Sequence, residues 1–152
     1  MPALPASKRL RIGRYAESSR IYLLTINTRD REPIFKDFSL GRGVVNQFRC
    51  AQDQGFANSL AWVVMPDHFH WLIELRQGSL GGLVQRTKSL STKAVKQSTG
   101  RTTSLWQRGF HDRALRREED LVKMARYVVA NPLRAGLVEK LGDYPLWDAI
   151  WV

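Results

Sequence analysis

The stretch that decides the fold is residues 57–75, ANSLAWVVMPDHFHWLIEL, in which a turn signal separates two apolar runs. Residues 57–65 and 68–75 are rich in β-branched and aromatic side chains, which is typical of strands. Between them, the Met65-Pro66-Asp67 step favours a turn because proline punctuates regular structure. The stretch therefore predicts a β-hairpin.

Alternate residues in 68–75 face opposite sides of the strand, and the two sets differ in chemistry. One set is wholly apolar and is expected to pack on the core helices. The other begins with two histidines separated by about 6.5–7 Å along the strand, so both imidazoles can lean toward one cation. The two sets are Phe69, Trp71, Ile73 and Leu75, and His68, His70, Leu72 and Glu74.

A His-x-His pair alone leaves several interpretations open. A histidine-triad nucleotide hydrolase would need a third histidine where Leu72 stands. A zinc metalloprotease would need HExxH on a helix, which is absent. Cys50 is the only cysteine, so a structural zinc site lacks ligands. Two possibilities remain, a structural pair held by hydrogen bonds or an open metal site that needs another ligand.

Working outward from the hairpin, the periodicity of the chain predicts two strands and three helices. Their order with the hairpin is β-α-β-β-α-β-α, the split βαβ, ferredoxin-like pattern plus one helix. We therefore predict an α+β fold in which an antiparallel sheet carries helices on one face and an added C-terminal helix. The elements are strands 20–28 and 104–115 and helices 34–54, 79–97 and 117–130.

The last helix carries two residues that could complete a site beside the histidines. Tyr127 and Asn131 are i and i+4 neighbours on the flank of its apolar stripe, so they point the same way. Tyrosine can act as a covalent nucleophile, although a free phenol has a pKa near 10. Alternatively, Tyr127 packs at the rim of the sheet and Asn131 ends the helix before Pro132. The buried stripe is Leu121, Met124, Ala125, Val128 and Val129.

Composition narrows the class of protein. The chain has 152 residues, which suits one domain, and a formal net charge of +10. That excess favours a nucleic acid partner, because neutralised phosphates release counterions. A single cysteine excludes an intrachain disulfide and fits a reducing cytoplasm. We expect no secretory signal and no membrane helix, since the longest strongly apolar run, 60–65, is far short of about 20 residues.

Four segments resemble the REP-associated tyrosine transposases, which belong to the single-tyrosine HUH transposases of bacterial insertion sequences. The resemblance covers about residues 13–150, and the combination of MPDHFHW with YxxxNP is specific. The segments are GRYAESSRIYLLTINTRDREPIF (13–35), WVVMPDHFHWLIEL (62–75), LWQRGFHDR (105–113) and ARYVVANPLRAGLV (125–138).

This resemblance implies a complete mechanism. His68, His70 and Asn131 are identified as ligands of Mg²⁺ or Mn²⁺, and Tyr127 as the nucleophile. Family members cleave single-stranded DNA to give a 5′-phosphotyrosine and a free 3′-hydroxyl, at hairpins formed by repeated extragenic palindromes. The expected setting is the bacterial cytoplasm, with nucleoid DNA as partner and a monomer or homodimer as the active form. A non-catalytic DNA-binding regulator and a metal-dependent phosphohydrolase remain as alternatives.

Further contacts to DNA are predicted from basic residues and aromatics. Residues 1–14 form a basic arm, 15–140 the transposase domain and 141–152 a tail, in which Trp147 and Trp151 suggest a short amphipathic segment that docks on the protein. His111 stays open between an extra ligand, a proton shuttle and a surface residue. The predicted DNA contacts are Lys8, Arg9, Arg11, Arg14, Tyr15, Arg86, Lys88, Arg108 and Arg113.

Overall fold

The computed structural model describes residues 20–150. The basic arm and part of the tail therefore lie outside the described residues, and so do the predictions for Lys8, Arg9, Arg11, Arg14, Tyr15 and Trp151.

The described residues form a five-stranded sheet in the order β4-β1-β3-β2-β5, and each neighbouring pair is antiparallel. Strands β1 and β2 run in the same direction with β3 between them, which is the split βαβ arrangement. The predicted α+β, ferredoxin-like fold is confirmed. The strands are β1 (Ile21–Asn27), β2 (Ala57–Met65), β3 (His68–Leu75), β4 (His111–Leu115) and β5 (Trp147–Ala149).

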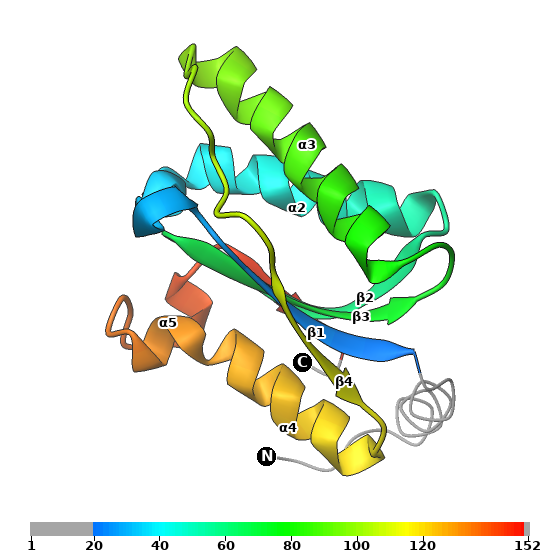
Figure 1. Cartoon of the computed structure of the whole chain (residues 1–152). Helices are drawn as coiled ribbons and strands as arrows, with labels where there is room; N and C mark the ends of the chain where they lie inside the picture. Colours follow the sequence, from blue (N-terminus) through cyan, green and yellow to red (C-terminus); the bar gives the residue numbers. More distant parts are fainter. Residues whose placement is uncertain (1–19, 151–152) are drawn as a thin grey trace.

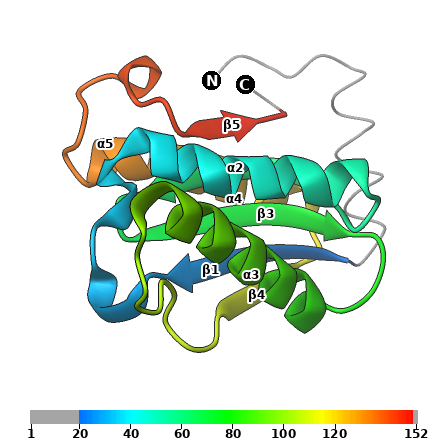
Figure 2. The same ribbon diagram turned by 90° about the horizontal axis from the view of Figure 1, so that it is seen from above.

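Helices cover both faces of this sheet (Figure 1). Two long helices lie side by side over one face (Figure 2), and a third helix followed by one short turn lies under the other. The starts of the two long helices are capped, since Asp37 accepts a hydrogen bond from Ser39 N and Ser79 Oγ accepts one from Gly82 N. The helices are α2 (Phe38–Asp53), α3 (Leu80–Thr99), α4 (Glu118–Val129) and α5 (Asn131–Arg134).

The hydrophobic core fills both sides of β3. On the α2 side, Phe48 stacks on Trp71 with ring centroids 4.4 Å apart and meets Phe69 edge to face. On the α4 side, Leu72 is fully buried with Leu121 and Val128. Burying each such side chain stabilises the fold by about 1.5–3 kcal/mol. Because both faces are covered, β3 is apolar except at His68, His70 and Glu74.

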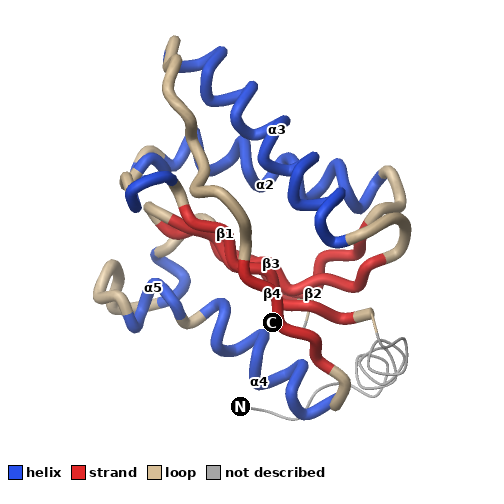
Figure 3. The backbone as a smooth tube through the Cα atoms, viewed as in Figure 1, coloured by secondary structure: helices blue, strands red, loops and turns tan. Residues whose placement is uncertain are grey.

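The structure corrects the predicted strand 104–115. Only His111–Leu115 is a strand, and the residues before it form a loop that touches β1 through an isolated bridge between Thr28 and Trp106 (Figure 3). Gly109 has a φ of 80°, which breaks an extended run. Lys88 Nζ holds this loop by donating to the carbonyls of Gln107 and Gly109.

Two further differences concern element ends. The helix predicted over 34–54 begins at Phe38, because Asp37 caps it and a 3₁₀ turn, Ile34–Lys36, precedes it. The tail around Trp147 is an edge strand rather than an amphipathic segment. It pairs with β2 and satisfies backbone groups that would otherwise be unpaired at this edge. None of the helices in residues 20–150 has the length and apolarity to cross a membrane.

Candidate active site

The two histidines lie at the start of β3, directly after the hairpin turn, and face α4. Their ring centroids are 5.0 Å apart with the rings nearly perpendicular. His70 is 9% exposed and His68 is partly buried. Strand alternation thus brings both imidazoles to one face, as the sequence predicts.

Each imidazole is held through its Nδ1 atom. Nδ1 of His68 lies 2.7 Å from Oδ1 of Asp67, and Nδ1 of His70 lies 2.8 Å from Oγ1 of Thr25. Arg31 Nε donates to the other carboxylate oxygen of Asp67 at 2.9 Å. With hydrogen on Nδ1, each ring leaves Nε2 as the acceptor, and neither Nε2 is hydrogen-bonded to another residue of the range 20–150. This is how metal-binding histidines are commonly oriented.

Sequence reasoning missed both of these orienting residues. Asp67 stands in the quoted motif, immediately before His68. In the sequence it was interpreted only as part of the turn signal, and its contact with His68 was not predicted. Thr25 lies 45 positions from His70, and only the β1–β3 register places the two opposite each other. The signal for Thr25 could have come from pairing the two predicted strands.

Burial keeps the histidines neutral at physiological pH. It lowers the pKa of His70 to about 4, and positive charge from His68, Arg134 and Arg31 acts in the same direction. Burial also lowers the pKa of His68, although the neighbouring Asp67 carboxylate opposes that shift. A neutral imidazole is the form that binds metal ions.

Tyr127 projects from α4 beside this pair. Its ring centroid is 6.1 Å from that of His70, and the side chain is 49% exposed. Arg134 covers the ring, with its Cζ atom 4.1 Å from the centroid, and donates to the Tyr127 carbonyl at 2.7 Å. The phenol is therefore accessible, next to the imidazoles and beside a fixed positive charge.

Asn131 is the first residue of α5, two positions after the end of α4. Its Nδ2 donates to the carbonyls of Tyr127 and Val128, so the side chain closes the last turn of α4. Its Oδ1 accepts no hydrogen bond within the described part of the chain. Residues 20–150 hold no group of three or more His, Cys, Asp or Glu that could bind a metal. A third ligand from these residues would therefore be of another type, such as an amide oxygen, and the assignment of Asn131 stays a prediction.

The predicted DNA contacts on the described residues divide into two groups. Arg113 lines the hollow that contains His70 and Tyr127, and Arg108 lines a groove with Arg29 and Arg31. Lys88 is occupied by the two loop carbonyls, and burial lowers its pKa.

Arg86, the remaining predicted DNA contact, and His111 differ in their position relative to the imidazole pair. Arg86 contacts Gln54 and the ring of Phe56, at the end of the sheet opposite the histidines. His111 is exposed on β4 and pairs with Thr25, so one strand separates it from His70.

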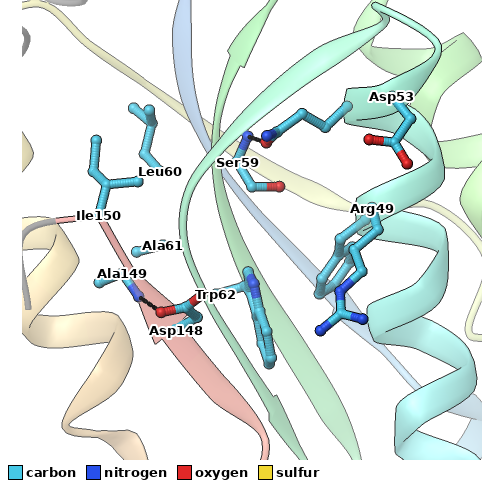
Figure 4. Close-up of a pocket in the computed structure, with 11 residues that line it drawn as sticks. Arg49, Asp53, Ser59, Leu60, Ala61, Trp62, Asp148, Ala149 and Ile150 are labelled. Atoms are coloured by element: carbon cyan, nitrogen blue, oxygen red, sulfur yellow. Dashed lines mark hydrogen bonds between the residues drawn. The ribbon is translucent and has the colours of Figure 1, made fainter.

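A second cavity, of about 280 Å³, lies at the edge of the sheet between α2, β2 and β5 (Figure 4). Its polar lining is Arg49, Gln52, Asp53, Ser59 and Asp148, without a histidine or tyrosine. Ala149 N and Ser59 N are already satisfied there by Asp148 and Gln52 side chains. Tyr127 and the His68–His70 pair lie instead on the α4 face.

Comparison with known proteins places this geometry in a family. Residues 17–131 match the family described as "Transposase IS200 like". The chain belongs to the IS200-like transposases. This family membership implies a DNA-cleaving enzyme. The matched range includes both histidines, Tyr127 and Asn131.

Named relatives of this transposase agree. An Escherichia coli REP-associated tyrosine transposase is 25% identical over 134 residues, covering 87% of this chain and 78% of that protein. A Haemophilus influenzae protein assigned to the same group is 27% identical over 142 residues, covering 82% and 77%. A solved REP-associated tyrosine transposase bound to a REP hairpin matches the fold with a TM-score of 0.70 at 22% identity, covering 85% of this chain and 76% of that one. The predicted resemblance is confirmed.

Proposed function

We propose that this transposase cuts and rejoins one strand of hairpin-forming DNA by transesterification at Tyr127. The observation that carries the proposal is the position of the half-exposed phenol, 6.1 Å between ring centroids from the buried imidazole of His70. The Nε2 atom of that imidazole is not hydrogen-bonded to any other residue within 20–150. An accessible tyrosine beside such a pair supports phosphoryl transfer to the protein better than simple packing of an aromatic ring.

The residues present suit a divalent cation. His68 and His70 would bind it through Nε2, and the Asn131 amide oxygen is the proposed third ligand. An amide oxygen suits a hard cation such as Mg²⁺ or Mn²⁺, whereas thiolates would favour zinc. When bound, such a cation polarises the phosphate oxygens and orients the scissile group.

In the proposed reaction, the phenol oxygen of Tyr127 replaces the 3′-oxygen on the scissile phosphorus. Its hydroxyl gives up a proton and its oxygen bonds to the scissile phosphorus. The bond from phosphorus to the 3′-oxygen of the preceding nucleotide breaks, and that oxygen takes up a proton to become a free 3′-hydroxyl. The product is a 5′-phosphotyrosine. Because one phosphodiester replaces another, attack by a second 3′-hydroxyl reverses the step without an external energy source.

Two arginines support the same chemistry through their charge. Arg134 lies over the Tyr127 ring, where a guanidinium is attracted to the aromatic face and stabilises a developing phenolate. Arg31 fixes Asp67 and thereby His68, and its charge also reaches His70. Together they favour the approach of an anionic phosphate.

The proposed substrate is hairpin DNA of the REP type in the bacterial nucleoid. The formal net charge of +10 supports a polyanion. Two adjoining grooves, about 620 and 670 Å³, run from Arg29 and Arg31 past Arg108 to Lys96 on α3. Side chains of this kind contact phosphates and position the nucleic acid without reading its sequence.

The test uses labelled hairpin oligonucleotides with single-stranded flanks, incubated with the protein and Mn²⁺ and run on a denaturing gel. We expect a protein–DNA adduct that disappears in Tyr127→Phe while binding persists. Tyr22→Phe is the matched control, because Tyr22 lies on β1 away from the histidines and should leave the adduct unchanged.

Each rival gives a different result in the same experiment. A non-catalytic regulator binds the hairpin but leaves it intact in the wild-type protein. A metal-dependent phosphohydrolase releases products with turnover and forms no adduct. Either outcome would overturn the proposed reaction.

A further inference from the structure

A hollow beside Tyr127 has no part in the steps above. It encloses about 540 Å³ between β1, β4 and α4. Two of its walls are His70 and Tyr127, so a group that fills it lies next to the reacting phosphate. Its lining is Leu23, Thr25, His70, Arg113, Leu115, Asp120, Lys123, Met124 and Tyr127.

The hollow exists because α4 covers the sheet unevenly. The helix packs chiefly against β2, with further contacts to β3 and β5. The half of this face formed by β1 and β4 is consequently less covered by α4. Register brings Leu23 opposite Arg113 and Ile21 opposite Leu115, so alternate side chains of both strands face the hollow.

Its chemical character is an apolar floor with a charged rim. Leu23, Leu115 and Met124 supply the floor, and all three are buried or partly buried. Arg113 and Lys123 are exposed cations at the rim. A volume within the roughly 300–1,000 Å³ of small-ligand sites suits a flat ring, and the cations suit the phosphate attached to it.

One further side chain in the lining would favour some DNA bases over others. Asp120, on the first turn of α4, is the one carboxylate that the described part of the chain contributes to the lining. A carboxylate accepts hydrogen bonds from the amino group of a base, as aspartate and glutamate do from cytosine N4. Thymine carries no exocyclic amine and offers no such donor.

We propose that this hollow receives one unstacked base of the nucleotide next to the scissile phosphate, and that it favours a base with an exocyclic amine. The seated base holds the strand so that the phosphate faces Tyr127. This inference rests on the proposed function, since it describes the substrate of the same site.

The test scans the substrate with missing bases. Hairpin oligonucleotides that the wild-type protein cleaves are remade with an abasic residue at each of three positions on either side of the cut. We expect a loss of about tenfold or more in cleavage rate at one flanking position, because the base that would hold the strand in the hollow is missing there. Placing adenine or cytosine at that position should restore a higher cleavage rate than placing thymine there.

Protein variants connect that position to the hollow. Met124→Trp fills the floor and should make cleavage insensitive to the abasic substitution, while Arg113→Ala should weaken binding of the intact strand. Arg126→Gln on α4 and Arg116→Ala after β4 are matched controls outside the lining, expected to behave as wild type. Because Arg113 is exposed, its variant stays informative if Met124→Trp fails to fold.

A binding readout separates this inference from catalysis. In Tyr127→Phe, 2-aminopurine at the sensitive position should change fluorescence on binding, and Arg113→Ala should reduce the change. Equal cleavage rates at all abasic positions would overturn the inference while leaving the transesterification intact. Absence of any cleavage by the wild-type protein would overturn the proposed function and this inference with it.

Discussion

The two faces of the sheet share the same strands but differ in what their helices leave open. On the α2 and α3 face, Phe69 and Trp71 are fully buried against Phe48. On the α4 face, a buried His70 stands beside a tyrosine that is 49% exposed. One face stabilises the fold through close packing. The other face is packed less completely, and the open space there holds Tyr127 beside the two histidines.

The largest expected effect of a single change is on the packed face. Trp71→Ala should reduce the free energy of unfolding by about 3–5 kcal/mol, because the surroundings cannot fill the cavity. Urea denaturation measures this loss. Tyr127→Phe, on the open face, should stay within about 0.5 kcal/mol of wild type. Similar losses for both variants would contradict the contrast between the faces.

Acidic pH should lower the free energy of unfolding because of His70 on the α4 face. His70 is neutral in the native state, with its pKa lowered from 6.5 to about 4, whereas the unfolded chain protonates it near 6.5. Stability present above pH 6.5 should therefore fall as the pH drops toward 4 and then level off, by about 3 kcal/mol in total. Urea denaturation with chelator at several pH values measures this.

The variant His70→Asn isolates that contribution. It should lose less stability than the wild-type protein between pH 6.5 and 4, since the group that titrates is gone. Parallel stability curves for the two proteins would show that His70 is not held neutral by the fold.

The orienting residues should matter for metal binding. Thr25→Val removes the partner of the His70 Nδ1, and Asp67→Asn replaces the charged partner of the His68 Nδ1 with a neutral amide. Each variant should weaken the apparent affinity for Mn²⁺ about 10–100-fold. Titration of the cleavage rate with Mn²⁺ measures this. Asp148→Asn, in the second cavity, is the control. If all three variants match wild type, the imidazoles are oriented by packing alone.

The smallest effect is expected for the cation over the phenol. Arg134→Gln removes a contact that contributes about 0.5–2 kcal/mol, so cleavage should slow by about 2–30-fold with little change in stability. Arg134→Lys should recover part of the rate, and Arg126→Gln should have no effect. Single-turnover cleavage compares them. An unchanged rate in Arg134→Gln would leave the guanidinium with a structural role only.

Local pattern was enough for much of the fold. The alternation in 68–75 and the apolar stripe of 117–130 each predicted an observed element, because periodicity reports directly which side chains meet the core. The placement of His68 beside His70 was also predictable, because the two residues are only two positions apart in one strand. The edge strand around Trp147 escaped prediction, since three residues carry little periodicity and the pairing depends on a distant partner, β2.

Parts of the site could not be predicted, because they depend on contacts between segments that are distant in the sequence. Thr25 and Arg31 act on the histidines only through the sheet register and the turn after β1. Arg134 follows Tyr127 by seven positions, but α5 must fold back for its guanidinium to reach the ring. Arg86 was predicted to contact DNA but lies at the end of the sheet opposite the histidines. The helical pattern alone does not indicate which end of the sheet a basic residue of that helix is near.

The most direct measurement is the mass of the DNA-linked peptide. After cleavage of a hairpin oligonucleotide with Mn²⁺ and digestion by trypsin and nuclease, the 5′-phosphate should be found on the peptide 127–134, YVVANPLR, at Tyr127. It should be absent with chelator and in His70→Ala. A phosphate attached to another residue, or efficient cleavage without any attached phosphate, would contradict the claim that this phenol and the two imidazoles form one site.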